Sequence, residues 1–258
     1  MSDQPVLLTM DGRIAVIRLN RPARLNALTP DMLACFLARL ETALIDRAKL
    51  ILITGAGRAF CAGADLAGDG LIDNDPGATL EQAYHPLFRR LAEIDIPLVS
   101  VINGPAVGAG AALALAADIS VMARSAYLQF GFVNVGLVPD SGVSWLLAHS
   151  VGRVRALELV LLGEAVPAGR AAAMGLVTRV ADDAHCFGEG MAIARRLAAG
   201  PSVALGLIRR QISAALDMGL DETMALEAAN ARHAGTTADF AEGVAAFREK
   251  RHPLFKGR

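Results

Sequence analysis

The sequence predicts an α/β domain followed by an all-helical C-terminal region. Two observations support this fold class. Up to about residue 185, short apolar runs typical of buried strands alternate with amphipathic stretches typical of helices. After that point, helical patterns follow one another with no strand pattern between them. In a chain of 258 residues we therefore expect a core domain at 1–185 and a helical region at 186–258.

The chain begins with a predicted β-hairpin and a predicted helix. Residues 6–9 and 14–19 have the composition of two strands, and Asp11-Gly12 supplies a two-residue turn between them. Thr29-Pro30 then reads as a helix start, with Thr as the N-cap and Pro at the first helical position. Apolar residues at helical spacing continue this helix.

The remaining elements continue the alternation. We expect strands at 50–54, 97–102, 119–123 and 177–180, and core helices at 79–93, 108–117, 144–150, 155–162 and 168–174. The C-terminal helices are expected at 187–199, 202–218, 221–233 and 237–250. A stretch rich in Gly and Asp at 67–78 lacks the spacing of a calcium-binding EF-hand loop, so we interpret it as a surface loop.

Composition and charge exclude several classes of protein. The net charge of −1 gives no electrostatic footprint for nucleic acid, and no apolar run reaches the roughly 18 residues of a membrane span. The N-terminus has no signal-peptide pattern. Three widely spaced cysteines without a CxxC motif argue against a disulfide framework or a zinc site and fit a reducing cytoplasm. The five histidines do not cluster, so we expect no metal site.

Two glycine-rich turns follow predicted strands, at 55–57 and 108–110. Neither continues with the glycine pattern, the long helix and the distal acid of a dinucleotide-binding site. Small residues at a strand-to-helix junction can leave main-chain N–H groups exposed, and two such turns together could bind one anionic oxygen. The alternative is that these small residues only allow close packing.

A single carboxylate, Asp140, stands among apolar and small residues in GLVPDSGVSW, residues 136–145. The simplest interpretation of Pro139-Asp140-Ser141-Gly142 is a type I turn. The second is a catalytic acid, and the residues alone do not decide between them.

Five stretches, in order, carry a specific resemblance. They are RPARLNAL (21–28), GAGRAFCAGADL (55–66), IPLVSVINGPAVGAGAALALAADI (96–119), GLVPDSG (136–142) and EGVAAFREKRHPLF (242–255). Over nearly its whole length the chain resembles the crotonase, or enoyl-CoA hydratase/isomerase, superfamily. The resemblance implies a spiral of ββα units at 1–185 that carries an acyl-CoA site, and a helical oligomerisation region at 186–258 that forms a homotrimer or a dimer of trimers. It implies no cofactor, because coenzyme A is part of the substrate.

The resemblance also assigns roles to residues. The two main-chain donors of an oxyanion hole fall on Ala64 and Ala109, and the catalytic acid falls on Asp140. The residues expected to contact the CoA or acyl group are Ala23, Arg24, Leu25, Ala62, Gly63, Asp65, Leu66, Phe132, Val138, Pro139, Phe247 and Lys250. Of these, Phe247 and Lys250 match positions that reach the CoA of a neighbouring subunit. Arg24 is a candidate phosphate partner, or else a surface arginine.

The two glutamates with which hydratases of this superfamily handle water are missing. Their positions correspond to Ala112 and Phe132 in this sequence, and neither residue can transfer a proton. The chain is therefore a poor candidate for a typical hydratase. The pattern GLVPDSG is instead similar to that of ring-1,2-epoxyphenylacetyl-CoA isomerases of aerobic phenylacetate breakdown, which also isomerise 3-enoyl-CoA to 2-enoyl-CoA. There the acid at this position is catalytic.

The resemblance predicts an isomerase in which one carboxylate shuttles a proton. Asp140 would remove a proton from one carbon of the acyl chain, the two amides would hold the enolate, and the same acid would return the proton two carbons away. We expect Phe132 and Val138 to desolvate Asp140. Trp145 has two interpretations, a plain core residue or a third side chain that lines this pocket. The loop at 67–78 is expected to cover the acyl pocket.

Three alternatives remain open. The protein could be a hydratase-like lyase, an aryl-CoA hydrolase or dehalogenase with Asp140 as nucleophile, or a CoA-binding protein without catalytic activity.

Overall fold

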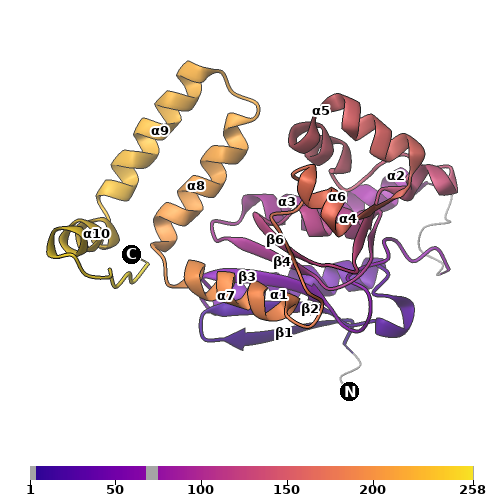
Figure 1. Ribbon diagram of the computed structural model, residues 1–258, viewed down its shortest axis with the longest axis horizontal. Coiled ribbons are helices and arrows are strands. Elements are labelled where there is room, and N and C mark those ends of the chain that lie inside the picture. Colours follow the sequence, from indigo (N-terminus) through magenta and orange to yellow (C-terminus); the bar gives the residue numbers. More distant parts are fainter. Residues whose placement is uncertain (1–3, 68–74, 258) are drawn as a thin grey trace.

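The computed structural model describes residues 4–67 and 75–257, and a six-stranded sheet forms its centre (Figure 1). The strands are β1 (Val6–Asp11), β2 (Ile14–Leu19), β3 (Leu50–Gly55), β4 (Leu98–Ile102), β6 (Ile119–Ala123) and β9 (Arg179–Ala181), in the order β1-β2-β3-β4-β6-β9. β1 and β2 are antiparallel, and all other neighbours are parallel. β3 and β4 are buried along their whole length, as parallel strands covered on both faces are.

A second, three-stranded sheet was not predicted from the sequence. It consists of β5 (Ala106–Val107), β7 (Tyr127–Gln129) and β8 (Ala165–Pro167), in the order β5-β7-β8. Strands of two or three residues are too short to show an alternation of apolar and polar side chains. This sheet matters for the site, because β5 leads directly into the second glycine turn.

Helices cover and extend the sheets. Those of the core are η1 (Pro22–Arg24), α1 (Pro30–Ile45), α2 (Pro76–Thr79), the π-helical η2 (Leu80–Tyr84), α3 (His85–Glu93), α4 (Ala109–Leu115), η3 (Gly131–Val135), α5 (Val143–Leu162), α6 (Ala168–Ala173) and α7 (Cys186–Ala198). Then follow α8 (Ser202–Ala215), α9 (Leu220–Gly235) and α10 (Ala238–Glu249). The α/β core with C-terminal helices is thus as predicted, and Thr29 caps α1 by accepting a hydrogen bond from Met32 N at 3.2 Å.

Local details differ from the predictions. Asp11 pairs with Ile14 across the hairpin, so the turn residues are Gly12 and Arg13 rather than Asp11-Gly12. The helices expected at 144–150 and 155–162 are one helix, α5, which is kinked at Gly152. The helix expected at 79–93 starts earlier and contains the π-helical segment η2.

The separate helical arm begins later than residue 186. α7 contacts β3, β4 and β6. A Cβ atom on its Gly190 would lie only 2.2 Å from a methyl carbon of Val101 in β4, so this helix packs tightly on the sheet. The predicted boundary therefore places one core helix in the helical region, and the arm that follows it consists of α8, α9 and α10 (Figure 1). α8 joins the arm to the core, because its Arg209 forms an ion pair with Asp118 at 2.8 Å.

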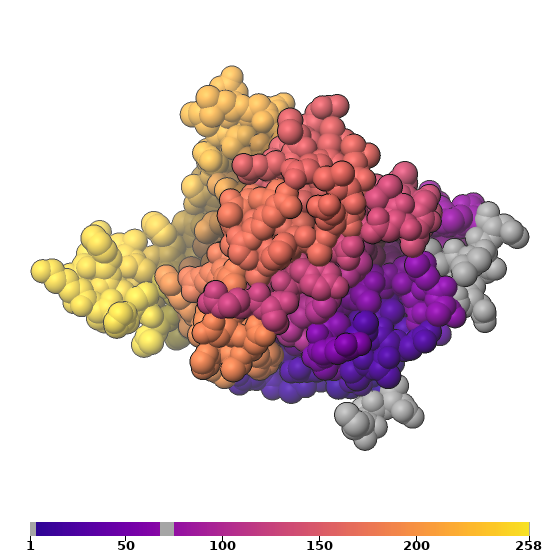
Figure 2. Space-filling view, turned by 45° about the vertical axis from the view of Figure 1, so that its right-hand side comes forward, coloured from indigo at the N-terminus to yellow at the C-terminus, as the bar shows by residue number. Residues whose placement is uncertain are grey.

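The arm projects from the body of the molecule, as its yellow C-terminal part shows in Figure 2. Many large apolar side chains on it are exposed, among them Ile208, Ile212, Leu220, Met224, Phe240, Phe247 and Leu254. Within the described residues, no single helix is long and apolar enough to cross a membrane. The pair α7 and α8, bent by 109°, passes this test together by length and composition only.

Candidate active site

The segment 55–66, called the first turn below, follows β3 and contains Gly63. It lies against the second turn, which joins β5 to α4 at Gly108. Val107 N donates to Cys61 O at 2.9 Å, and Cys61 N donates to Pro105 O at 3.1 Å. Gly63 has a φ of +86°, and a Cβ atom on it would lie 2.7 Å from Val107 O and 3.7 Å from the Cα of Gly108. Glycine is therefore required at position 63, and the two turns are in direct backbone contact.

The main-chain N–H groups of Ala64 and Ala109 extend from these two turns. Gly63 O accepts from Leu28 N at 2.7 Å, and because the C=O and N–H of a trans peptide point in opposite directions, the Ala64 N–H points away from Leu28. Gly108 O accepts at 3.1 Å from the first turn of α4, so the N–H of Ala109, the first residue of that helix, points out of it. Within 4–67 and 75–257, neither amide donates to another residue. Two unpaired amides on touching turns can bind one anionic oxygen.

Asp140 lies at the turn that leads into α5. Its carbonyl accepts from Val143 N at 2.9 Å, and the two central residues, Ser141 and Gly142, have φ values of 52° and 81°. The turn therefore spans 140–143 with positive φ at both centres, as in type I′, and the predicted type I turn at 139–142 is wrong. A positive φ at a serine is strained, and such strain is often found at functional sites.

The Asp140 carboxyl group is partly buried. Its Oδ1 is buried with no hydrogen-bond partner among the described residues, and the same holds for Ser141 Oγ. Burial raises the pKa of Asp140, while the neighbouring Ser141 hydroxyl and the charge of His85 act against this rise. An ionised carboxylate with a raised pKa and an unpaired oxygen is a stronger base than an exposed one.

The side chains predicted to shield Asp140 are not equally buried. Phe132 is buried, and its ring would lie 3.8 Å from a Cβ atom on Gly108, so η3 packs against the second turn. Pro139 is half-buried. Val138 is 77% exposed and Trp145 is 42% exposed, so neither can shield much of the carboxylate. Trp145 stacks on His149 and is not the core residue that its sequence context favoured.

Tyr84 and His85 lie near Asp140, although sequence reasoning did not select them for the site. Tyr84 is fully buried at the end of η2, and its hydroxyl lies 3.5 Å from Leu28 O, next to the bridge that pairs Leu28 with Ala64. Burial raises the pKa of Tyr84, and the charge of Asp140 adds to the rise. Tyr84 therefore stays protonated. A π-helical segment, as here at 80–84, often marks a functional site, but the sequence has no clear signal for it.

The predicted CoA-contacting residues of the N-terminal part lie together. Ala23, Arg24 and Leu25 lie in η1 and directly after it, and Leu25 O accepts from Ala62 N at 3.0 Å. Leu66 is exposed at the end of the same turn. Most of the predicted pocket-covering loop at 67–78 lies outside the described residues, at 68–74.

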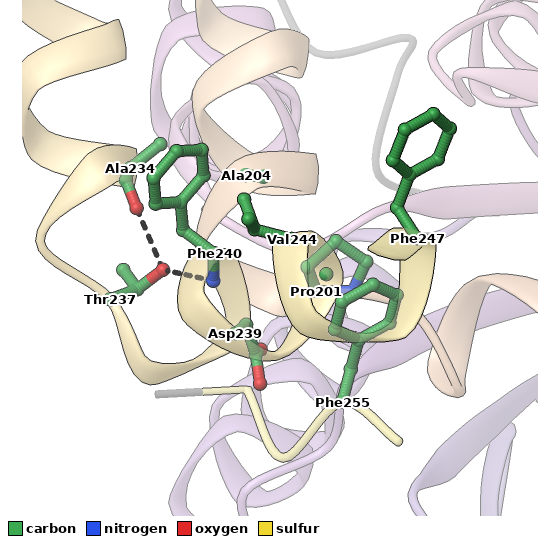
Figure 3. Close-up of a pocket in the computed structure, with 10 residues that line it drawn as sticks. Pro201, Ala204, Ala234, Thr237, Asp239, Phe240, Val244, Phe247 and Phe255 are labelled. Atoms are coloured by element: carbon green, nitrogen blue, oxygen red, sulfur yellow. Dashed lines mark hydrogen bonds between the residues drawn. The ribbon is translucent and has the colours of Figure 1, made fainter. Parts of the chain in front are cut away.

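Phe247 and Lys250 lie at the end of α10, which Figure 1 shows on the opposite side of the molecule from α4. One chain therefore does not bring them to the other site residues, and their contact with the CoA of a neighbouring subunit stays a prediction. Phe247 is 86% exposed at the rim of an apolar pocket of about 350 Å³ (Figure 3). Other residues that line this pocket are Pro201, Phe240, Val244 and Phe255.

The described residues contain no group of three or more His, Cys, Asp or Glu side chains that could hold a metal ion. Cys61, which lies in the first turn, is fully buried, and burial raises the pKa of its thiol to about 12. The thiol therefore stays protonated and does not act as a base at ordinary pH.

Replacing Asp140 by Asn is expected to raise the thermal stability at neutral pH. Because the folded pKa lies above the ordinary value of 3.8, ionisation of Asp140 destabilises the folded state. Below pH 3.8, Asp140 is protonated in both the folded and the unfolded state, so it does not lower the free energy of unfolding. The loss of stability grows as the pH rises from 3.8 to the raised pKa of folded Asp140, and it is constant above that pKa. Thermal unfolding measured across this range should show a gap between variant and wild type that opens with rising pH, and a constant gap would contradict the assignment.

Asn26 fixes the conformation of the first turn. It is fully buried with a φ of 57°, which asparagine tolerates, and its Nδ2 donates to Ala56 O, Ala59 O and Phe60 O at 2.9, 2.9 and 3.2 Å. We expect Asn26→Ala to lower the free energy of unfolding by at least about 2 kcal/mol, because buried carbonyls lose their donor. Urea unfolding measures this, with Asn230→Ala as the control. A change no larger than that of the control would show that these bonds contribute little.

Comparison with known proteins assigns the family. The model of the enoyl-CoA hydratase/isomerase family matches residues 9–258. The chain belongs to this family, and the crotonase fold predicted from the sequence is confirmed.

Individual relatives are similar over their whole length. The 1,2-epoxyphenylacetyl-CoA isomerase of Escherichia coli K12 is 41% identical over 260 residues, which cover 98% of each chain. A probable enoyl-CoA hydratase of Rhodobacter capsulatus is 40% identical over 100% of both chains. The crystal structure of an enoyl-CoA hydratase subunit from Geobacillus kaustophilus matches with a TM-score of 0.92, at 35% identity and over 98% of each chain.

Proposed function

We propose that the protein is an acyl-CoA isomerase with one catalytic acid, Asp140. The observation that carries this proposal is the partly buried carboxylate, which has one oxygen without a hydrogen-bond partner among the described residues, while Ala112 and Phe132 stand at the positions of the two missing glutamates. The substrate class is an enoyl-CoA or an epoxidised phenylacetyl-CoA thioester.

The reaction on a 3-enoyl-CoA needs a single proton shuttle. Asp140 removes a proton from C2, and the electron pair of that C–H bond moves toward the thioester, whose oxygen becomes negative. The N–H groups of Ala64 and Ala109 stabilise this enolate oxygen, each by about 2.7–4 kcal/mol if they match donors of this kind elsewhere. The protonated Asp140 then delivers the proton to C4, so that the double bond moves from C3–C4 to C2–C3 and the carboxylate is restored.

Addition of water is disfavoured by the residues that line this region. Ala112 is fully buried in α4, and Phe132 packs beside Gly108. A methyl group and a phenyl ring can neither activate water nor protonate a carbon. Since one relative is an isomerase and another a probable hydratase, these two residues, together with Asp140, favour the isomerase.

The CoA part of the substrate is assigned to residues on and around η1 and the first turn: Ala23, Arg24, Leu25, Ala62, Gly63, Asp65 and Leu66. Arg24 is the phosphate partner in this proposal, since its side chain is 52% exposed. Phe132, Val138 and Pro139 would face the acyl group. No cofactor takes part.

A homotrimer or a dimer of trimers would complete the site. The exposed apolar side chains of α8, α9 and α10 support burial of the arm in an oligomer, since contiguous exposed apolar surface marks interaction sites. Phe247 and Lys250 of one subunit would then contact the CoA bound by its neighbour. Sedimentation of the purified protein tests this, and a monomer would contradict it.

We place the enzyme in the cytoplasm, where the free cysteines stay reduced.

An assay of the purified protein in D₂O tests the reaction class. A 3-enoyl-CoA, a 2-enoyl-CoA and an epoxidised phenylacetyl-CoA are offered side by side, and products are followed by mass spectrometry. We expect isomerisation with deuterium entering C2 or C4, and little 3-hydroxyacyl-CoA. Rapid formation of 3-hydroxyacyl-CoA would favour a hydratase, and a covalent adduct on Asp140 would favour a nucleophilic mechanism. No turnover of any thioester would contradict the proposal.

A further inference from the structure

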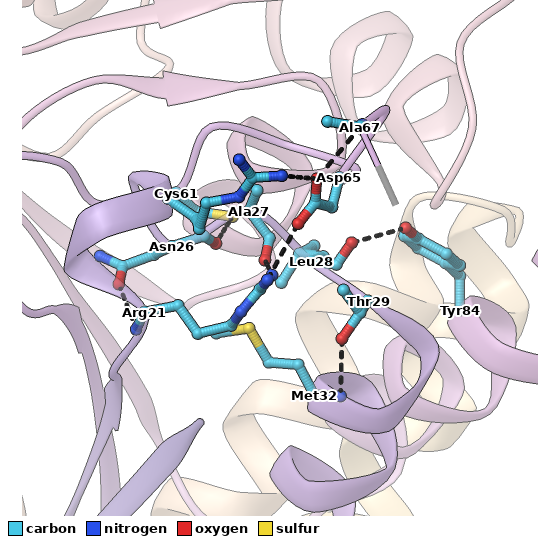
Figure 4. A network of polar contacts seen from close by, with 11 residues as sticks. Arg21, Asn26, Ala27, Leu28, Thr29, Met32, Cys61, Asp65, Ala67 and Tyr84 are labelled. Carbon is cyan, nitrogen blue, oxygen red and sulfur yellow. Dashed lines mark hydrogen bonds and ion pairs between the residues drawn. The ribbon is translucent and has the colours of Figure 1, made fainter. Parts of the chain in front are cut away.

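A network of polar contacts joins the loop at 21–28 to the first turn (Figure 4). Arg21 lies at its centre: one guanidinium nitrogen donates to Ala27 O at 2.6 Å and another to Asp65 Oδ2 at 3.0 Å. The main-chain N of Arg21 donates to Asn26 Oδ1 at 2.9 Å. Arg21 thus holds three parts of the site in one arrangement, and its side chain is only 25% exposed.

Both carboxylate oxygens of Asp65 accept hydrogen bonds. Its side chain is 7% exposed, Oδ2 accepts from Arg21, and Oδ1 accepts from Arg24 and from Ala67 N, both at 3.3 Å. Burial alone would raise the pKa of Asp65, but the hydrogen bonds from Arg21 and Ala67 and the charges of both arginines hold it below the usual range. An enclosed anion of this kind is a poor direct ligand for the phosphates of CoA, which are also negative, so the part of Asp65 in CoA binding proposed above would be indirect, through Arg24.

Main-chain hydrogen bonds with Leu28 and the side chain of Asp65 together hold the turn that carries the Ala64 N–H. Asp65 N donates to Leu28 O at 2.9 Å, and Gly63 O accepts from Leu28 N at 2.7 Å, so the peptides on both sides of Ala64 are held by one residue. The side chain of Asp65 ties the same turn to Arg21. Loss of the carboxylate would leave the two main-chain bonds to Leu28 in place but remove the tie to Arg21, so we expect the turn to shift and the Ala64 N–H to point less accurately at the oxyanion.

Arg24 is held much more loosely than Arg21. Its only side-chain hydrogen bond to a described residue is the 3.3 Å contact with Asp65. A guanidinium has five N–H donors, so Arg24 can bind an anion while Asp65 keeps its bond to Arg21.

We propose that Asp65 is a positioning residue that couples recognition of the CoA phosphate to the oxyanion hole. Through its bond to Arg21 it fixes the direction of the Ala64 N–H. Through its bond to Arg24 it holds that guanidinium where the CoA phosphate would bind. This inference rests on the proposed function. It separates two arginines only three positions apart, since Arg21 serves the chemical step and Arg24 serves binding.

The test compares Asp65→Asn, Arg21→Lys and Arg24→Gln with the wild type, and uses Asp182→Asn, which breaks the exposed Arg124–Asp182 ion pair of 2.9 Å, as the matched control. Two readouts are used. One is the steady-state kcat and KM for a 3-enoyl-CoA. The other is the infrared carbonyl stretch of a bound, unreactive acyl-CoA labelled with ¹³C in the thioester, which an oxyanion hole shifts to lower frequency.

We expect Asp65→Asn to lower kcat by about tenfold or more and to reduce the carbonyl shift, as expected when a charge-assisted hydrogen bond is lost. Arg21→Lys keeps the charge but not the forked contacts, so it should reduce the shift while KM changes little. Arg24→Gln should raise KM by about tenfold and leave the shift intact. Circular dichroism shows whether each variant is folded. If Asp65→Asn does not fold, Arg21→Lys tests the coupling in its place.

A normal carbonyl shift and a normal kcat in folded Asp65→Asn or Arg21→Lys would overturn the coupling. A reduced shift in Arg24→Gln equal to that in Asp65→Asn would overturn the division between the two arginines. If the wild type itself binds no acyl-CoA or shows no carbonyl shift, the proposed function fails rather than this inference.

Discussion

Asp140→Asn is expected to lower kcat on a 3-enoyl-CoA by about 10²–10⁴-fold, the usual contribution of a positioned acid/base group. The amide has nearly the same size as the carboxyl group but cannot accept the proton from C2. Binding of the thioester should change little, because the proposed CoA contacts lie on η1 and the first turn. Steady-state kinetics and calorimetric titration with an unreactive acyl-CoA measure the two effects separately.

Asp31→Asn is the matched control, since Asp31 is an exposed carboxylate in the first turn of α1. It should behave as the wild type. If Asp140→Asn retained kcat within a fewfold of wild type, another group would have to be the base. The site would then have to be assigned again, starting from His85.

Ala109→Pro is expected to lower kcat by about 10²–10³-fold, as the loss of one oxyanion donor does. The substitution removes the N–H donor and places a ring carbon on the same nitrogen, where the amide proton pointed. Proline is favoured at the first position of a helix, where that N–H has no partner within the helix. Gly108 precedes it with φ 54° and ψ −124°, the mirror image of the extended conformation that residues before proline adopt, which glycine can take. α4 should therefore still form.

Ala238→Pro makes the same change at the exposed first residue of α10, where Thr237 is extended with φ −80° and ψ 150°. It should retain wild-type activity, and thermal unfolding should show both variants folded. A folded Ala109→Pro variant with near wild-type kcat would show that the enolate oxygen does not depend on this amide.

Much of the fold could be predicted because its elements are long or strongly patterned. The strands at 50–54 and 97–102 are apolar except for Thr54 and Ser100, and the start of α1 has both Thr29 as cap and Pro30 in the first helical position. The three short strands of the second sheet have no pattern of their own, since tertiary contacts create them. α7 could not be separated from the arm by sequence, because a helix that packs on a sheet and one that packs in an arm have the same periodicity.

The site was predicted in part. Motifs quoted from the sequence selected the two turns and Asp140, and the structure brings the two turns into contact. The actual form of the 140–143 turn was not predictable, because the positive φ of Ser141 is unusual for that residue type. The contacts of Arg21 could not be predicted for a similar reason: an arginine in a loop reads as a surface residue until its partners Ala27 and Asp65 are known.

The crystal structure of the protein with an unreactive 3-enoyl-CoA analogue tests the central claim most directly. We predict the thioester oxygen within about 3 Å of both Ala64 N and Ala109 N, and a carboxylate oxygen of Asp140 within about 3.5 Å of C2 or C4. A thioester oxygen bound to neither amide, or an Asp140 side chain turned to solvent while the acyl chain lies elsewhere, would contradict the account.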